Sequence, residues 1–423
     1  MSIGAESICL VTASHISCNP RIVKEADALQ EAGYKVRVVS VLHDDGQYAI
    51  DRDLAETKSW EWDMVDARKT TYQSYLLWSK AALRQKCYQT SRIFEELPMG
   101  LEREYSRYVN EVFTCAAKRK AALFIAHTLP ALPAAYRASI LQGGILAFDA
   151  EDFHRGEFGT ERDDPETIRR TIAIEERYLP RCSHVTASSK GVADAYAEAL
   201  NIEKPKTILN TFPMEERSGQ TPVEDLSRER HGGEISLYWY GQTIGPDRGL
   251  DDALDALPAL GERVHLHVRG TWSNGFKSAF MRKAIRLGVA KRVHHLEPVG
   301  PSQLVERAAQ HDVGLALETG ATVNREICVT NKLLTYILAG IAIVATRTTG
   351  QCEVMSKASE AGLTYRSGDP AALAKILRTW RDDRETLLKA KTAAKIAGVS
   401  FFNWNCEKRE LLEHVRGALT KLP

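Results

Sequence analysis

The stretch ISLYWYGQTIGPDRGLDDALDALPAL, residues 235–260, joins an apolar run to an amphipathic segment through a glycine-rich loop. Its first six residues predict a buried strand, and the segment from Leu250 on predicts a helix. The loop between them contains Gly241, Gly245, Arg248 and Gly249. Glycines let a backbone approach a ligand closely, while the free N–H groups of a helix start and an arginine favour an anion. The loop is either a simple connection or a phosphate-binding site, and the isolated arginine favours the second.

The same alternation of apolar runs and helical segments continues in both directions from this stretch. The runs cover residues 7–13, 35–42, 121–128, 144–150, 184–189, 206–211, 235–241, 264–270, 293–299, 312–318, 341–346 and 362–367. Such alternation is typical of βαβ units and parallel sheets. We therefore predict an α/β protein with two Rossmann-like, doubly wound domains that face each other across a cleft. Ligands are expected at the carboxyl ends of the strands.

The domain boundaries follow from length and from one polar segment. A chain of 423 residues is long for a single hydrophobic core. Residues 214–234 are polar, contain glycine, serine and proline, and lack apolar periodicity, as expected of a linker. We predict a first domain over residues 1–213 and a second domain over residues 235–400.

Composition narrows the possible partners and the cellular location. The formal net charge is +1, so no overall field attracts nucleic acid or lipid, and no nucleic-acid partner is expected. The eight cysteines include no CxxC pair, which favours reduced thiols over a disulfide framework. No apolar stretch has the length of a membrane-spanning helix. These observations predict a cytoplasmic protein.

The first predicted helix has clear end signals. Asn19 is the expected N-cap, Pro20 the first helical residue and Gly33 the residue just past the end. Arg21 and Lys24 then lie near the first turn, where they either meet an anionic or polyhydroxylated ligand or remain solvated surface charges. The preceding loop lacks GxGxxG, so a nicotinamide dinucleotide is not expected in the first domain.

Several stretches together resemble the GT-B glycosyltransferases, and within them the retaining group called family 4. They are NPRIVKEADALQEAGYKVRVVS (19–40), AHTLPALPAAYRA (126–138), FDAEDFH (148–154), ILNTFP (208–213), YGQTIGPDRGL (240–250), NKLLTYILAGIAIVAT (331–346), TGQCEV (349–354) and FFNWNCEKRELLEHV (401–415). The resemblance implies that the second domain binds a nucleoside-diphosphate sugar and the first receives the acceptor. It also implies a final helix, residues 401–423, that crosses back to the first domain, and no metal ion or other cofactor.

At the positions where that family has cations that bind the donor, this chain differs from the family pattern. The family places an arginine directly after the first glycine of the loop and a lysine six positions later, where this chain has Gln242 and Arg248. Arg248 keeps a charge that can bind two phosphate oxygens, and Gln242 can donate a neutral hydrogen bond. Lys332 in NKLL matches the second donor-side cation of the family; the alternative is a surface lysine at a helix start. With Gly241 and Gly249, these residues form the predicted phosphate site.

The carboxylates depart from the pattern as well. The resemblance puts the second of two glutamates where this chain has Thr335, which can make at most a weaker contact with the donor. Glu318 and Glu326 show the seven-residue gap typical of the family but lie too early in the chain. Glu318 ends a strand at its carboxyl edge and is the better catalytic candidate. Glu326 is either its partner or a solvated loop charge.

Further candidates follow strands of the first domain. His127 ends a predicted strand, and the family often has a histidine there that approaches the donor sugar; the alternative is a hydrogen-bonded core histidine. Asp149 and Glu151 resemble an acceptor-side stretch of the family, and Arg21 joins them as a candidate. His294 and His295 are adjacent, so they point to opposite faces of a strand and are not expected to chelate one metal ion. We therefore predict no metal site.

The resemblance implies a glycosyltransferase of the hexosyltransferase type that acts with retention. Loss of a nucleoside diphosphate builds negative charge, which cations aimed at the leaving group stabilise. No convincing nucleophile is present, so attack from the face that the leaving group vacates is expected. Two alternatives stay open: a nucleotide-sugar epimerase of the same shape, and an inactive nucleotide-sugar-binding protein.

Residues 70–92 combine aromatic and basic side chains. Either they form helices packed on the first domain, or they offer an amphipathic surface for peripheral membrane contact. The acceptor is expected to be a sugar, a lipid-linked compound or a small molecule, and this segment is where its choice is expected to be decided.

Overall fold

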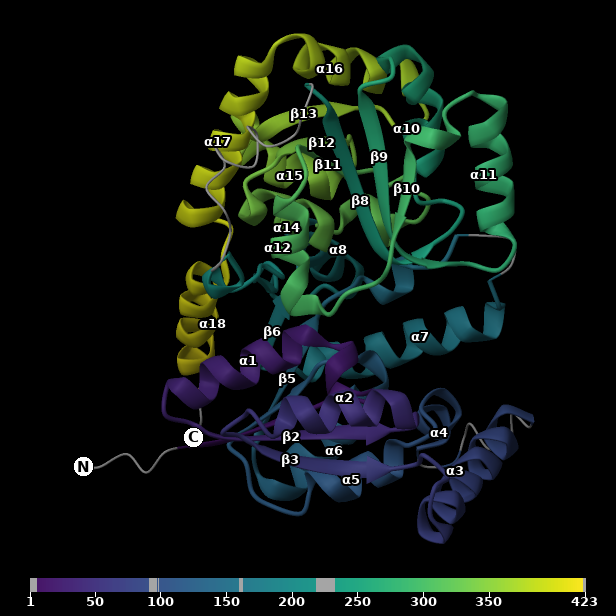
Figure 1. Cartoon of the computed structure of the whole chain (residues 1–423). Coiled ribbons are helices and arrows are strands. Elements are labelled where there is room, and N and C mark those ends of the chain that lie inside the picture. The colour runs from purple at the N-terminus through teal and green to yellow at the C-terminus, as the bar shows by residue number, and fades with distance from the viewer. Residues whose placement is uncertain (1–5, 91–96, 98, 160–162, 218–232, 421–423) are drawn as a thin grey trace. The chain divides into compact units, whose positions relative to one another are not determined.

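The computed structural model describes residues 6–90, 97, 99–159, 163–217 and 233–420 (Figure 1). The chain forms two compact units. The first consists of Met1–Ser188, Val192–Ile208 and Lys408–Pro423, and the second of Ser189–Gly191 and Leu209–Glu407. Most of the predicted linker, residues 218–232, lies outside the described residues, as do residues 421–423. The linker residues Met214–Arg217 form a short 3₁₀ helix.

The first unit is built on a parallel sheet of seven strands in the order β3-β2-β1-β4-β5-β6-β7. The strands are β1 (Ser7–Val11), β2 (Lys35–Leu42), β3 (Glu61–Asp66), β4 (Leu123–Ala126), β5 (Ile145–Ala150), β6 (His184–Ala187) and β7 (Lys206–Thr207). Six of them coincide with the predicted runs, although β7 is only two residues long. The sequence missed β3, because an edge strand is partly exposed and EWDMVD carries three carboxylates.

The helices of this unit are α1 (Pro20–Glu31), α2 (Asp45–Ala55), α3 (Tyr72–Thr90), α4 (Gly100–Tyr105), α5 (Val109–Ala116), α6 (Leu132–Gln142), α7 (Pro165–Tyr178) and α8 (Lys190–Leu200). The predicted ends of α1 are confirmed. The Asn19 side chain accepts a hydrogen bond from the Ile22 N–H, Pro20 is the first helical residue, and Gly33 has a φ of 93°. Among the described residues, no helix is long and apolar enough to cross a membrane.

The second unit is built on a parallel sheet of six strands in the order β10-β9-β8-β11-β12-β13. The strands are β8 (Ile235–Ile244), β9 (Val264–Trp272), β10 (Val293–Leu296), β11 (Val313–Ala316), β12 (Ala342–Thr346) and β13 (Gly362–Tyr365). All six coincide with predicted runs. Because β8 and β11 lie side by side, the loops after them meet at one edge of the sheet.

Both faces of this sheet are covered by helices. They are α10 (Leu250–Ala256), α11 (Phe276–Arg286), α12 (Leu304–Ala309), α13 (Val323–Ile327), α14 (Asn331–Ala339), α15 (Thr349–Lys357), α16 (Pro370–Asp382) and α17 (Arg384–Ser400). The last helix, α18 (Trp404–Leu419), belongs to the first unit from Lys408 on. In β8, Leu237 and Trp239 pack with α10, α11 and α16, while Tyr238 and Tyr240 pack with α12, α14 and α15 (Figure 1). Because both faces of the sheet are buried, the strands are continuous apolar runs.

Glycine at position 314 sets how closely α14 approaches the sheet. A Cβ atom on Gly314 would lie 2.3 Å from the ring of Tyr336, a distance that real side chains do not tolerate. The missing side chain therefore allows α14 to pack directly on β11. The helix begins at Asn331, and Lys332 is its second residue.

Candidate functional site

The loop between β8 and α10 lies against the segment that follows β11. Gly249 has a φ of 68°, and a Cβ atom there would lie 2.1 Å from the carbonyl oxygen of Leu317, so only glycine fits. The carbonyl of Asp247 accepts a hydrogen bond of 3.2 Å from the guanidinium of Arg325. The glycine-rich loop and the segment after β11 thus form one surface of the second unit.

Glu318 lies in this surface and is held at both its backbone and its side chain. Its carbonyl accepts a hydrogen bond of 2.6 Å from the Thr346 hydroxyl at the end of β12. Its Oε1 lies 2.7 Å from Nζ of Lys332, and the residue is only 6% exposed. The structure therefore brings together Glu318 and Lys332, two of the residues that the sequence singled out.

Three cations surround the Glu318 carboxylate. Burial favours its neutral form, but Lys332 and then Arg248 and Arg325 outweigh burial and hold the pKa of Glu318 below its ordinary value. The carboxylate is thus ionised at neutral pH. These four side chains carry a net charge of +2, which suits a ligand with two or more negative charges.

Of the three cations, Arg248 has the most hydrogen-bond donors that are not engaged with the described residues. It is half-buried and makes no hydrogen bond to the described residues, whereas Lys332 is bound to Glu318 and Arg325 to Asp247. Gln242 is exposed at the end of β8. Gly241 packs on Trp239, since a Cβ atom there would lie 2.7 Å from that ring. The guanidinium of Arg248 can therefore donate hydrogen bonds to a ligand that binds at this loop.

The helix after the loop contributes less than the sequence suggested. The first turn of α10 carries Asp251 and Asp252, and the helix has only seven residues. Asp251 pairs with Lys283 at 2.7 Å, and Asp252 accepts hydrogen bonds from Tyr365 and Gly368. Two carboxylates already give this helix start negative charge, so anion binding here depends on the side-chain cations.

The other two donor-side candidates, Thr335 and Glu326, are engaged within the second unit. Thr335 is fully buried and shares a hydrogen bond of 2.7 Å with the hydroxyl of Tyr240. Glu326 accepts hydrogen bonds from the backbone N–H (2.9 Å) and the hydroxyl (2.8 Å) of Thr349, at the start of α15. Glu326 therefore caps a helix, and Glu318 is the carboxylate that lies among the cations.

Arg325 is a site residue that the sequence analysis missed. It lies on α13, a short helix in the long connection between β11 and α14. The signal was present in the charged segment ETGATVNRE, but only the fold shows that its arginine faces the loop after β8.

The candidates of the first unit form a buried ionic cluster. The guanidinium of Arg21 donates to both oxygens of Asp149, at 2.5 and 2.8 Å, and to the carbonyl of Ile208. His127 Nε2 lies 2.9 Å from Glu25 of α1, and its Nδ1 lies 3.4 Å from Asp149, as ion pairs rather than well-aligned hydrogen bonds. None of these four side chains is more than 3% exposed.

In this cluster, the pairing of opposite charges outweighs the effect of burial on the pKa values of His127 and Asp149. Burial disfavours the imidazolium, but Glu25 and Asp149 outweigh it and raise the pKa of His127 to about 9. Asp149 is buried too, yet Arg21 and His127 hold its pKa far below the ordinary value. Glu151 is half-buried beside the cluster, and burial raises its pKa. The roles predicted for these residues in sugar and acceptor binding stay predictions.

The same cluster is the one place among the described residues where three potential metal ligands lie within 4.8 Å of one another, namely Glu25, His127 and Asp149. Arg21 already binds both oxygens of Asp149, and the raised pKa of His127 keeps its ring protonated. These charges occupy the ligand atoms, so the cluster is an ion-pair network.

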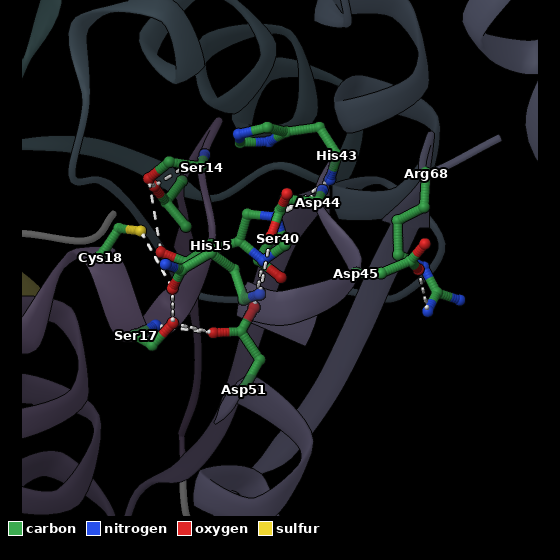
Figure 2. A network of polar contacts seen from close by, with 12 residues as sticks. Ser14, His15, Ser17, Cys18, Ser40, His43, Asp44, Asp45, Asp51 and Arg68 are labelled. Carbon is green, nitrogen blue, oxygen red and sulfur yellow. Dashed lines mark hydrogen bonds and ion pairs between the residues drawn. The ribbon is translucent and has the colours of Figure 1, made fainter. Parts of the chain in front are cut away.

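A second network in the first unit fixes the loop between β1 and α1 (Figure 2). His15 Nε2 accepts hydrogen bonds from the backbone N–H groups of His43 (3.0 Å) and Asp44 (3.1 Å), so its proton is on Nδ1, which donates to Asp51 at 2.6 Å. Asp51 also accepts from the N–H and hydroxyl of Ser17. The sequence analysis missed this network, because Asp51 comes from α2 and not from the loop itself.

Comparison with known proteins agrees with this architecture. A family model described as glycosyl transferases group 1 matches residues 234–383, and no curated protein sequence matches the chain. Anabaena HepE in complex with UDP is a similar solved structure: it is 17% identical, with 97% of this chain and 100% of that chain covered and a TM-score of 0.70. The same protein has also been solved with UDP-glucose, with a TM-score of 0.69.

Two further solved structures are similar over nearly their whole length. A glycosyltransferase from Rickettsia africae is 13% identical, with 99% of each chain covered and a TM-score of 0.67. Sucrose-phosphate synthase from Thermosynechococcus elongatus is 14% identical, with 98% of this chain and 99% of that chain covered and a TM-score of 0.71. The likeness shows the fold: the two parallel α/β sheets are those of GT-B glycosyltransferases, and the predicted fold class is confirmed.

The cation cluster predicts how nucleoside diphosphates bind. Arg248→Ala should weaken binding of the best nucleoside diphosphate by about 1.5–3 kcal/mol, because a hydrogen-bonded charge is lost. Arg325→Ala should weaken it less, since that guanidinium is shared with a backbone carbonyl. Calorimetric titration measures both, with Arg286→Ala on the exposed part of α11 as the control. Wild-type affinity in the Arg248 variant would refute the assignment.

The raised pKa of His127 predicts a pH-dependent stability. The folded state holds the proton more tightly than the unfolded state, so the stabilisation is complete below the unfolded pKa of about 6.5. It should be lost as pH rises through the folded pKa of about 9. Urea unfolding between these pH values should show a decline in stability that His127→Gln flattens and His295→Gln leaves in place. An equally steep decline in His127→Gln would contradict the shifted pKa.

Proposed function

We propose that this protein is a glycosyltransferase that moves a sugar from a nucleoside-diphosphate sugar to an acceptor. The match of residues 234–383 to the group 1 glycosyltransferases and the GT-B fold support this proposal. The UDP and UDP-glucose complexes of HepE support a nucleotide sugar as the donor. The family 4 assignment and transfer of a hexose rest on the resemblance of sequence motifs.

The observation that carries the proposal is the excess of positive charge after β8 and β11. Arg248, Arg325 and Lys332 face a single carboxylate, Glu318. In parallel α/β sheets, ligands bind at the carboxyl ends of the strands, where these residues lie. A diphosphate is the group that such a site would bind best, because it supplies the missing negative charge and several acceptor oxygens.

The same charges would promote the chemical step. When the bond between the sugar and the phosphate breaks, negative charge grows on the nucleoside diphosphate. Cations that are already in position stabilise this charge in the transition state without reorganising. In the proposed mechanism Arg248 donates to the phosphate oxygens, and Lys332, oriented by Glu318, lies close enough to share the charge.

We assign to Glu318 the role of orienting Lys332 and the donor sugar. Its second carboxylate oxygen would accept a hydrogen bond from a hydroxyl group of that sugar. Neither Glu318 nor Glu326 is a suitable nucleophile, since the first is paired with Lys332 and the second caps α15. Retention through attack from the face of the leaving group is therefore our preferred mechanism. Because the three cations can neutralise the diphosphate, we propose that transfer requires no metal ion.

The acceptor is proposed to be a sugar, a lipid-linked compound or a small molecule that binds to the first unit of a cytoplasmic, peripherally membrane-associated enzyme. On α3, Tyr72, Tyr75 and Leu83 are 77%, 51% and 67% exposed, and Lys80 and Lys86 are exposed beside them. Exposed aromatic and basic side chains on one helix favour contact with an anionic lipid surface. Residues 91 and 92 of this predicted segment lie outside the described residues.

Incubation with a panel of nucleotide sugars tests the proposed activity. A transferase should slowly hydrolyse one of them, or release its nucleoside diphosphate faster when an acceptor is added, and EDTA should leave the rate unchanged. An epimerase would convert the sugar without an acceptor, and an inactive protein would at most bind. Either of these outcomes would overturn the proposed function, and loss of activity in EDTA would overturn its metal independence.

Sedimentation with vesicles tests the membrane contact separately. The wild-type chain should co-sediment with vesicles containing anionic lipid, and the double substitution Tyr72→Ser and Tyr75→Ser should reduce the bound fraction. Exposed Leu388 on α17 offers a control, as Leu388→Ser. Equal binding by the double variant and the wild type would contradict a role for α3.

A further inference from the structure

Four histidines of the second unit gather around one cavity. The cavity has a volume of about 440 Å³ and is lined by His265, His267, His294 and His311 together with Glu234 and Ser236. In the sheet, Ser236 pairs with His265, and His267 pairs with His294. Residues two apart on a strand share a face, so the HLH sequence at 265–267 puts two of these rings on the side where His294 lies.

His265 and His294 are the closest pair in this cluster. The Nδ1 atom of His265 lies 3.0 Å from the Nε2 atom of His294. Two imidazole nitrogens bound to one ion at ~2.0–2.1 Å, with an angle of ~90–110° between them, lie ~2.9–3.4 Å apart. The observed separation is within this range, so both nitrogens can bind one ion once the two rings turn from each other toward it.

The surroundings of the pair are those of a metal ligand set. The second ring nitrogen of His265 lies 3.9 Å from the carboxylate of Glu234, which is too far for a hydrogen bond but places a negative charge on the side of the ring away from His294. His267 stacks on His294 with ring centres 4.7 Å apart, and its Nδ1 shares a hydrogen bond of 2.9 Å with Ser236. Both ligand histidines lie on strands, which hold their positions.

The pair is also accessible to an ion. A neutral imidazole supplies the lone pair that a metal ion needs. Both rings are only partly buried, so an ion can reach them from the cavity.

We propose that His265 and His294 bind a divalent transition-metal ion such as Zn²⁺, through Nδ1 of the first and Nε2 of the second. Imidazole nitrogen is a ligand that suits zinc, copper and nickel, and water completes the coordination. Without metal, one of the two facing nitrogens carries a proton that it donates to the other. On binding, that proton moves to the far nitrogen of the same ring, and both rings remain neutral.

This site is separate from the proposed donor site within the second unit. His265 and His294 are the second residues of β9 and β10, whereas Arg248 and Glu318 follow the carboxyl ends of β8 and β11. The inference does not rest on the proposed function. The argument from sequence against a metal site considered only His294 with its neighbour His295, while the structure supplies the second ligand from the adjacent strand.

Calorimetric titration of the untagged full chain with Zn²⁺ tests the proposal. We expect one equivalent to bind at pH ~7.5. His265→Gln and His294→Gln should each weaken affinity by more than ~10-fold, since even outer partners of a metal site contribute about 10- to 100-fold. Bound Zn²⁺ should also raise the melting temperature of the wild type.

His295→Gln is the matched control, because His295 lies on the same strand and its Nε2 donates a hydrogen bond of 2.8 Å to the Gly270 carbonyl rather than facing His265. It should bind Zn²⁺ as the wild type does. Failure of the wild-type chain to bind would overturn the proposal. So would unchanged affinity in both ligand variants, or loss of binding in His127→Gln, which would point to the buried cluster of the first unit. Circular dichroism confirms that each variant is folded.

Discussion

The ion pair between Glu318 and Lys332 is the interaction on which the proposed donor site depends. A carboxylate that is 6% exposed would be costly without a partner, and a lysine 2.7 Å away supplies one. The pair joins the end of β11 to the start of α14, whose position follows from the close packing of Tyr336 on Gly314. Because Glu318 neutralises only one cation, the charges of Arg248 and Arg325 remain available for an anion.

In the buried cluster of the first unit, by contrast, positive and negative charges are equal in number. Arg21 and His127 are matched by Glu25 and Asp149, and all four side chains are closed off from solvent. Such a cluster has no charge left for a ligand, and its consequence is pH-dependent stability. Glu318 and the three cations around it in the second unit have a surplus of positive charge, and the Arg248 guanidinium among them makes no hydrogen bond to the described residues. This difference supports placing the diphosphate in the second unit.

Much of the fold could be predicted from the sequence, because buried parallel strands leave a strong pattern. Every predicted run contains a strand, and Asn19, Pro20 and Gly33 define α1 as expected. The strand β3 was missed because an edge strand needs little apolar surface. The extent of β7 was overestimated, since ILNT continues the apolar pattern although its pairing with β6 ends with the hydrogen bond from the Ile208 N–H to the Ala187 carbonyl.

The candidate site was predictable only where one local motif contained it. Arg248, Gly249 and Lys332 could be found from the loop and from NKLL, but Arg325 and the capping role of Glu326 depend on contacts between segments. The burial of His127 was equally hidden, because Glu25 comes from a helix a hundred residues earlier in the chain. Pairing between strands likewise brings His265 to His294. Local patterns identify residue types, whereas tertiary contacts decide their partners.

A double-mutant cycle on Glu318 and Lys332 tests the central claim most directly. The affinity for the nucleoside diphosphate that binds best would be measured in the wild type, Glu318→Gln, Lys332→Met and the double variant. Lys332→Met removes a cation and leaves an uncompensated carboxylate, so it should weaken binding strongly, and Glu318→Gln should restore part of the loss. We predict a coupling energy of about 0.5–3 kcal/mol, as found for residues in direct contact. Additive effects of the two substitutions would contradict the account.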